Sequence, residues 1–203
     1  MAQTKLFIFR EDTPEYGKDE YIKHKHIKEK TILSKQYQID IAKSACSANT
    51  AVILPTGLGK TIIAFLVIAK ILPKKILFLA PTKPLVMQHY ESTKRFINID
   101  KSTITMLSGS ISPKKRNKLF ERGVIVISTP QTIKNDLQKN LYSLDDIGLV
   151  IFDEMHKAVE NYAYVEIAKR FRGLILGLTA SPGSRKKKIR QIFENLKIKN
   201  VES

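Results

Sequence analysis

Short apolar runs alternate with amphipathic stretches from residue 37 onward. The runs are unbroken rather than alternating in polarity, as expected for strands that are covered on both faces. They lie at Ala51–Leu54, Ile76–Ala80, Thr103–Leu107, Val124–Ile127, Leu149–Phe152 and Leu174–Leu178. Between them, Thr61–Leu72 is almost entirely apolar and predicts a buried helix. The stripes that begin at Tyr164 and Ile189 repeat at i, i+3, i+4 and i+7, which is the helical period.

This alternation predicts an α/β fold with a mostly parallel sheet, helices on both faces and right-handed crossovers. Ligands of such sheets bind at the carboxyl ends of the strands. Residues 1–30 are predicted to be an N-terminal accessory segment, with a short strand at Met1–Arg10 and a loop at Glu11–Glu20. Residues 31–203 are predicted to form the main domain.

The charge of the chain changes this picture by favouring a polyanionic partner. Lys and Arg number 35 against 19 Asp and Glu, a formal net charge of +16, while 43% of the residues are hydrophobic. The surplus concentrates in Lys18–Lys35, Lys114–Arg122 and Arg185–Lys199. Clusters of one sign favour nucleic acid. The alternative is a lysine-rich, solvated surface, and for Lys114–Arg116 and Arg185–Lys188 both interpretations stay open.

Cysteine usage and apolar length predict an intracellular, cytoplasmic setting without a membrane. Cys46 is the single cysteine, so no intramolecular disulfide can form, and it is interpreted as a small buried apolar residue. Leu6–Phe9 is too short for the core of a signal peptide. Ile62–Leu72 is interrupted by Lys70 and falls well short of the roughly 20 residues of a membrane-spanning helix.

A phosphate-binding loop is predicted at Pro55–Thr61, between an apolar run and a helix. Glycines let the backbone curl and point its N–H groups inward, and the start of the helix attracts phosphate. Lys60 would reach the β- and γ-phosphates, and Thr61 would offer its hydroxyl to magnesium. The strict pattern has Gly where this chain has Leu54. The candidate ATP-binding residues here are Thr56, Gly57, Leu58, Gly59, Lys60 and Thr61.

An acidic pair follows the run Leu149–Phe152. Asp153 at the end of a predicted strand would hold Mg²⁺, directly or through water, and Glu154 would polarise the attacking water. Together with Lys60 they are the candidate catalytic residues. Metal ligation by His156 is not expected, because no His/Cys cluster accompanies it.

The order of these motifs resembles that of superfamily 2 helicases. Asp153–His156 is similar to a DExH box, and Gln38 stands at the glutamine position of the upstream adenine-reading element. Lys35 stands where Arg is more usual. Thr179-Ala180-Ser181 resembles the motif that couples ATP state to nucleic acid, which implies coupling roles for His156, Thr179 and Ser181.

Across about residues 20–203 the series resembles the archaeal Hef helicase/nuclease and the eukaryotic FANCM family more narrowly. The segments that carry this resemblance are Pro55–Thr61, Ala80–Val86, Gln88, Ser128–Thr132, Asn135–Leu137, Lys157–Val159, Asn161–Tyr164 and Gly177–Ser184. Met155 and Glu160 depart from it, since Ala and Gly are usual there. The resemblance implies a RecA-like ATP-binding lobe at 31–203, with ATP and Mg²⁺ as cofactors.

The resemblance also implies contacts with the nucleic-acid backbone at the ends of predicted strands. Small polar, Gly and Pro residues can offer N–H and hydroxyl groups to phosphates without reading sequence. The alternative for Pro81 and Pro130 is loop punctuation. Tyr162 could stack on a base, whereas Tyr164 begins the helical stripe and is predicted to lie in the core. The implied contact residues are Pro81, Thr82, Lys83, Ser108, Gly109, Thr129, Pro130 and Gln131.

The function expected from the resemblance is the ATP-binding lobe of an ATP-dependent helicase or translocase acting on forked or branched DNA. Such enzymes need a second RecA-like lobe that supplies arginine fingers, so this chain alone is expected to bind nucleotide and hydrolyse ATP slowly. Two alternatives stay open: an RNA helicase or RNA-stimulated ATPase, and a nucleotide-gated nucleic-acid-binding module that does not hydrolyse. An unrelated P-loop kinase is not favoured, because that function would not explain the helicase-like motifs that follow the phosphate loop.

Overall fold

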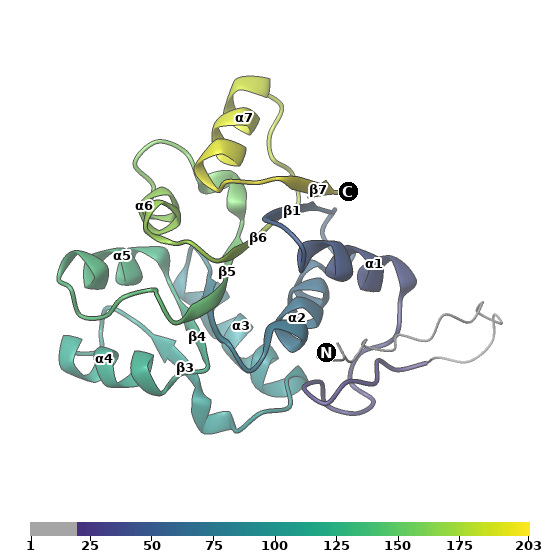
Figure 1. The fold of residues 1–203 in the computed structure, drawn as a ribbon, viewed down its shortest axis with the longest axis horizontal. Helices are drawn as coiled ribbons and strands as arrows, with labels where there is room; N and C mark the ends of the chain where they lie inside the picture. The colour runs from purple at the N-terminus through teal and green to yellow at the C-terminus, as the bar shows by residue number, and fades with distance from the viewer. Residues whose placement is uncertain (1–19) are drawn as a thin grey trace, which may run out of the picture.

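A seven-stranded, wholly parallel sheet forms the centre of the molecule. The structure, a computed structural model, describes residues 20–203. The strand order is β3-β4-β2-β5-β6-β1-β7 (Figure 1). The predicted α/β fold class is confirmed. The strands are β1 (Thr50–Ile53), β2 (Lys75–Leu79), β3 (Ile104–Leu107), β4 (Ile125–Ser128), β5 (Ile147–Asp153), β6 (Leu174–Thr179) and β7 (Asn200–Glu202).

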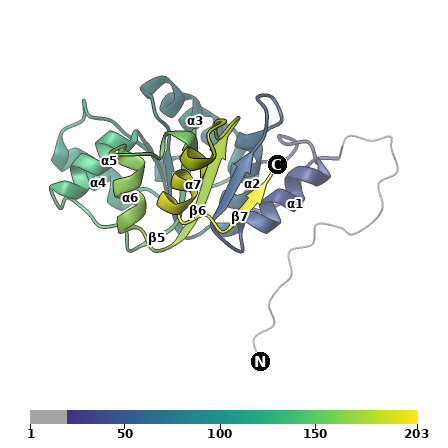
Figure 2. The same ribbon diagram turned by 90° about the horizontal axis from the view of Figure 1, so that it is seen from above.

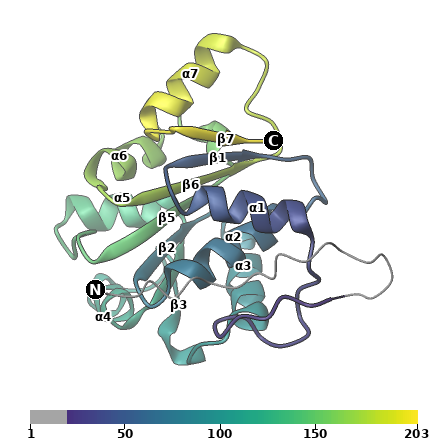
Figure 3. The same ribbon diagram turned by 45° about the vertical axis from the view of Figure 1, so that its right-hand side comes forward.

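Helices cover the sheet on both sides, as Figure 2 shows from above. The helices α1, α2 and α3 pack on one face, and α4, α5, α6 and α7 pack on the other (Figure 3). Their bounds are α1 (Gln36–Ala45), α2 (Lys60–Ile71), α3 (Lys83–Phe96), α4 (Pro113–Arg122), α5 (Pro130–Gln138), α6 (Ala163–Arg170) and α7 (Lys186–Asn195), with 3₁₀ turns η1 (Lys101–Thr103) and η2 (Met155–Lys157).

Alternation along the central strands builds two cores from one sequence pattern. On β2, Ile76 and Phe78 face α2 and α3, whereas Leu77 and Leu79 face the opposite helices. Successive side chains of a strand point to opposite faces, so an unbroken apolar run fills both cores. This explains why the predicted strands carry no polar alternation.

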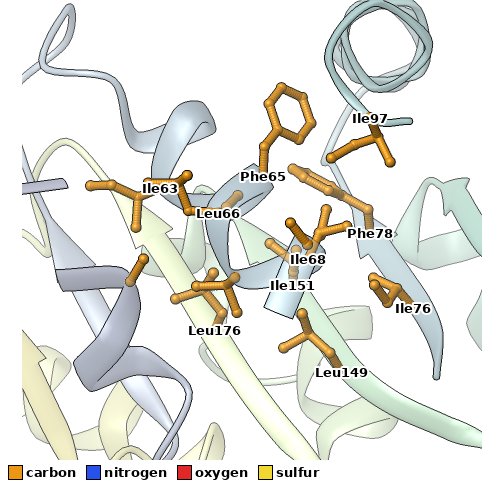
Figure 4. Close-up of a cluster of buried hydrophobic side chains, with 14 of the residues drawn as sticks. Ile63, Phe65, Leu66, Ile68, Ile76, Phe78, Ile97, Leu149, Ile151 and Leu176 are labelled. Carbon is orange, nitrogen blue, oxygen red and sulfur yellow. The ribbon is translucent and has the colours of Figure 1, made fainter. Parts of the chain in front are cut away.

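Helix α2 is apolar all round because it is buried between the sheet and its neighbours. Residues 63–69 are all buried. Phe65 packs its ring 5.5 Å from that of Phe96, and Ile68 lies among strand side chains (Figure 4). Each large apolar side chain buried in this way contributes about 1.5–3 kcal/mol. The core therefore anchors α2, whose first residue is Lys60.

All six predicted strands are present, and one strand was missed. Strand β7 pairs with β1 at the edge of the sheet. Its three residues, Asn200–Glu202, contain a single apolar side chain, so no apolar run announces it. Only the pairing with β1 defines this strand.

Residues 20–33 pack against the domain rather than standing apart from it. Tyr21 bridges to Leu33, and Ile27 bridges to Ile97 at the end of α3. Ile22 and Ile27 are buried in the core beneath α2 and α3. The strand predicted at Met1–Arg10 lies outside the described residues.

Two smaller expectations concern Cys46 and membrane-spanning length. Cys46 is half-buried, packs at the rim of the core, and has a raised pKa because burial disfavours its thiolate.

Within residues 20–203, no helix has the length and apolar character needed to cross a membrane.

The two departures from the Hef-type series sit in different environments. Met155 is fully buried and fills the space above Gly177, where an added Cβ would lie 2.5 Å from the Met155 sulfur. Glu160 is exposed and has φ 51°. A side chain is disfavoured in this left-handed region, which explains why Gly is usual at that position.

We expect Glu160→Gly to raise the free energy of unfolding by about 0.5–1 kcal/mol. Relief of the left-handed backbone, roughly 1–2 kcal/mol, exceeds the entropy that glycine adds to the unfolded chain. Urea denaturation measures the change. Glu160→Ala is the matched control, because it removes the carboxylate and keeps the Cβ. Equal stability of the Gly and Ala variants would contradict the strain argument.

Candidate functional site

The carboxyl ends of six neighbouring strands form one continuous edge, and each predicted motif that directly follows a strand lies on it. The phosphate loop follows β1, Thr179-Ala180-Ser181 ends β6, and Asp153–His156 follows β5. The segments implied to contact nucleic acid, Pro81–Lys83, Thr129–Gln131 and Ser108–Gly109, follow β2, β4 and β3, in that spatial order. Residues that are distant in sequence therefore share an edge because all the strands are parallel.

The phosphate loop curls through two left-handed glycines. Gly57 has φ 91° and Gly59 has φ 80°, and Gly59 is the N-cap of α2 without a side-chain cap. The first-turn N–H groups of α2 are thus free of a capping side chain, which suits an anion. The amine of Lys60 is 2.7 Å from the Leu54 carbonyl and 3.3 Å from that of Pro55.

Gln38 lies against the phosphate loop, together with its neighbour Tyr37. The Tyr37 hydroxyl donates to the Leu58 carbonyl at 2.9 Å, and Gln38 Nε2 lies 3.3 Å from the same oxygen. A Cβ on Gly59 would lie 2.3 Å from Gln38 Nε2, so a larger residue there would displace the Gln38 amide from this position. The loop and the start of α1 therefore touch directly.

Asp153 is held from two sides. His89 on α3 donates from Nε2 to Asp153 Oδ2 at 2.8 Å, and both side chains are largely buried. The Tyr164 hydroxyl donates to the Asp153 backbone carbonyl at 2.6 Å. Burial raises the pKa of Tyr164, so this hydroxyl stays a donor. Tyr164 lies in the core, as predicted.

Glu154 and His156 lie beside the end of β6, where His156 and Thr179 form a hydrogen bond. Glu154 has φ 51°, and its Oε2 is 3.2 Å from His156 Nδ1. That nitrogen is 3.1 Å from Thr179 Oγ1, which in turn donates to the Ser181 carbonyl at 2.8 Å. The single hydroxyl hydrogen of Thr179 is used there, so His156 donates from Nδ1. Glu154, His156 and Ser181 line an open depression together with Ala180 and Lys188.

The donor set fits magnesium held mainly by phosphate and water. Among residues 20–203 no group of three or more His, Cys, Asp or Glu side chains is placed to hold a metal. Mg²⁺ in nucleotide sites commonly needs only one or two protein oxygens beside the phosphates. The Thr61 hydroxyl, in the first turn of α2, and the Asp153 carboxylate, at the end of β5, have the required chemistry.

The segments after β2, β4 and β3 lie side by side. Ser128 pairs with Leu79 on one side and with Leu107 on the other. Most of the residues implied to contact nucleic acid are exposed or half-buried in these segments, including Thr82, Lys83, Ser108, Gly109, Thr129 and Gln131. Pro130 is buried in the first turn of α5. Pro81 is half-buried.

Arg116 differs from what the sequence suggests, and Tyr162 packs partly against the core. Arg116, within the run Lys114–Arg116, was a candidate for phosphate contact or a solvated face, and it is neither. It is 6% exposed and pairs with Asp136. Tyr162 is half-buried with its ring edge-on to Tyr164 at 5.0 Å.

Sequence reasoning missed His89 and Tyr37. His89 shares the buried face of α3 with Val86 and Thr93, at i, i+3 and i+7. That spacing was a usable signal for a histidine on an apolar helix face. The sequence around His89 does not, however, identify Asp153 as its partner. Tyr37 is adjacent to Gln38, and its bond to Leu58 depends on the loop conformation.

Comparison with known proteins identifies the family and the relatives that this chain resembles. Residues 24–184 match the family model ResIII, described as type III restriction enzyme, res subunit. A Methanocaldococcus jannaschii protein named as an ATP-dependent RNA helicase is 48% identical over 90% of this chain. The ATP-dependent DNA helicase fml1 of Schizosaccharomyces pombe is 38% identical over 83% of the chain.

A solved structure resembles this chain in both fold and sequence. The crystal structure of the Pyrococcus furiosus Hef helicase domain has a TM-score of 0.82 and 45% sequence identity, covering 83% of this chain and 38% of that one. The chain spans only 24% and 21% of the two curated relatives. The chain belongs to the ResIII family, as a Hef-type superfamily 2 helicase domain.

Proposed function

We propose that this chain is the ATP-binding lobe of an ATP-dependent DNA helicase or translocase that acts on forked or branched DNA. The observation that carries the proposal is the division of one sheet edge. The phosphate loop follows β1 and the acidic pair follows β5, with the Thr179–Ser181 motif after β6 between them, whereas the segments implied to contact nucleic acid follow β2, β4 and β3. Relatives named as ATP-dependent DNA helicases support the choice of DNA.

In this proposal the residues around α2 bind the nucleotide. Gln38 reads the adenine, and the N–H groups of residues 57–61 receive the phosphates. Lys60, which now rests on two carbonyls, moves to the β- and γ-phosphates. Thr61 and Asp153 would hold Mg²⁺, which supplies charge neutralisation when bound. Glu154 orients the attacking water.

Coupling would pass through contacts that already join the motifs. The Leu54 N–H donates to the Thr179 carbonyl at 3.1 Å, which ties the phosphate loop to the end of β6. Thr179 in turn bonds His156, beside Glu154. A change at the γ-phosphate would thus reach Ser181 through two short paths. A second RecA-like lobe and a DNA strand are the partners that this arrangement would serve.

An RNA substrate is the second candidate, and a specific observation favours it. The relative of 48% identity is named as an ATP-dependent RNA helicase. None of the proposed backbone contacts has a group assigned to the 2′-hydroxyl, which is what distinguishes RNA from DNA. Stimulation of ATP hydrolysis by forked DNA or by duplex RNA separates the two substrates.

We expect Glu154→Gln to lower DNA-stimulated ATP hydrolysis by about 10²–10⁴-fold while nucleotide affinity stays within about twofold. The amide keeps the shape of the side chain but cannot take a proton. The measurement is ATPase turnover with forked DNA in the protein that carries both lobes, beside binding of a fluorescent nucleotide.

Glu160→Gln is the matched control for Glu154→Gln, because it neutralises an exposed carboxylate just beyond the same turn. Its turnover should equal that of the wild type. Retained hydrolysis in Glu154→Gln would refute the role of Glu154. A wild-type protein that binds ATP and nucleic acid without hydrolysis would instead be a nucleotide-gated binding module.

We expect His89→Leu to raise the Mg²⁺ concentration for half-maximal nucleotide binding by about tenfold, since a lost partner of a metal-holding carboxylate typically costs 10–100-fold in metal affinity. Without the 2.8 Å bond, Asp153 loses its orientation. Titration of fluorescent ADP binding with Mg²⁺ measures this. Gln88→Leu, at the exposed neighbouring position, is the control, and identical Mg²⁺ curves for both variants would disprove the role of His89.

DNA affinity should fall steeply with salt, with a log–log slope of about −0.9 for each duplex phosphate neutralised. Lys83, exposed at the start of α3, is expected to account for one such contact. Lys83→Gln should therefore make the slope shallower by about 0.9. Fluorescence anisotropy over a salt series measures both slopes. A flat response of the wild-type chain would remove the electrostatic basis of binding.

A further inference from the structure

A buried ion pair joins α4 to α5, which start in the loops that follow β3 and β4. Arg116 on α4 donates from Nε to Asp136 Oδ2 at 2.7 Å, and from Nη2 to Asp136 Oδ1. The Tyr142 hydroxyl donates to Asp136 Oδ2 at 2.9 Å, and its ring stacks on Phe120 at 3.7 Å. We call Arg116, Asp136 and Tyr142 the Arg116 cluster.

The cluster is almost completely withdrawn from water. Arg116 is 6% exposed and Asp136 is 0% exposed. The bond to Asp136 raises the pKa of Arg116, and burial raises the pKa of Tyr142, so both remain donors. Burying a charge pair often contributes little net stability, because desolvation offsets the attraction. A role in geometry explains such a pair better than stability does.

The bonds of Arg116 reach directly into a proposed DNA-binding segment. Its Nη1 donates to the carbonyl of Ile111, in the turn where the Ile111 N–H donates to the Ser108 carbonyl at 3.0 Å. One guanidinium therefore fixes both the Ser108–Ile111 turn and helix α5. Five donors in a planar fork allow Arg to do this, and Lys cannot.

The other end of the cluster leads to the segment after β4. Asp136 lies six residues after Pro130, the first residue of α5, and the N-cap Thr129 bonds Thr132 through their hydroxyls at 2.9 Å. The segments also touch at the strand ends, where the Ser128 hydroxyl donates to the Leu107 carbonyl at 3.2 Å. The contact between Ser128 and Leu107 therefore joins the two segments at the strand ends, and the Arg116 cluster joins them a second time, farther from the sheet.

We propose that Arg116, Asp136 and Tyr142 are positioning residues for nucleic-acid binding, which set the spacing between the Ser108–Ile111 turn and the Thr129–Thr132 start of α5. This inference rests on the proposed function for its biological meaning. Phosphate contacts fix the register and orientation of a protein on the nucleic acid, so two phosphate-binding segments act together only when their separation is held. The cluster holds it from beneath, without touching DNA.

Asp136→Asn and Tyr142→Phe test the proposal with little change in side-chain volume. Asp136→Asn leaves the guanidinium without its counter-charge, and Tyr142→Phe removes one hydrogen bond. We expect forked-DNA affinity to fall about tenfold in Asp136→Asn and about threefold in Tyr142→Phe, the range for residues that act through others. Nucleotide affinity should stay within about twofold, because α2 lies on the opposite face of the sheet.

Hydrogen exchange gives a readout that needs no DNA. Amides of residues 108–112 and 129–132 should exchange faster in both variants, while those of residues 57–61 should not change. Asp146→Asn is the matched control. Asp146 pairs with Lys75 at 2.5 Å at the amino end of β2, away from the loops, so its loss should change neither exchange nor binding.

The outcomes separate the two proposals. Unchanged exchange and DNA affinity in folded variants, with folding checked by thermal melting, would overturn the positioning role. Parallel losses of DNA and nucleotide affinity would also overturn it, because they indicate general destabilisation. A wild-type chain that binds no DNA, while the variants still show faster exchange at both loops, would overturn the proposed function and leave the spacing role as a structural one.

Discussion

Burial of the central sheet on both faces is the constraint on which the rest of this structure depends. Strands such as β2 and β5 carry apolar side chains toward both helical layers, so they offer no surface for chemistry along their length. Polar functional side chains can therefore be placed only at the ends of the strands. Because all seven strands are parallel, one edge collects every carboxyl end, and the candidate site is spread along it.

Behind that edge, buried polar contacts connect helices to strand ends and to one another. His89 on α3 reaches Asp153, Tyr164 on α6 holds the Asp153 backbone, and Arg116 on α4 reaches Asp136 on α5. Each partner is nearly dry, so each contact is costly to break and leaves little freedom of position. The loops at the surface can be short because their supports lie underneath. We regard these contacts as the link between the rigid core and the proposed chemistry.

The phosphate loop shows how the same edge can also move. Lys60 rests on the carbonyls of Leu54 and Pro55, and Leu58 accepts bonds from Tyr37 and Gln38. These are local contacts that phosphate can replace, whereas the Leu54 bond to Thr179 belongs to the sheet. Replaceable contacts next to permanent ones are what a nucleotide-dependent switch requires. The proposed path through His156 starts at this boundary.

The sequence by itself determined the elements and the local motifs, because burial and turn chemistry are written in short windows. Six apolar runs predicted six strands, and two glycines before Lys60 predicted the loop. The tertiary structure decided which strands are neighbours. It put β6 between β5 and β1, so Thr179 separates the phosphate loop from Asp153. It paired Arg116 with Asp136 and His89 with Asp153, and it gave Asn200–Glu202 a strand partner. These partners lie 20 or more residues apart, and a charge or a histidine on a helix face has the same local pattern whether it meets solvent or a buried carboxylate. Only the packing of helices on the sheet, which depends on the whole chain, selects between the two.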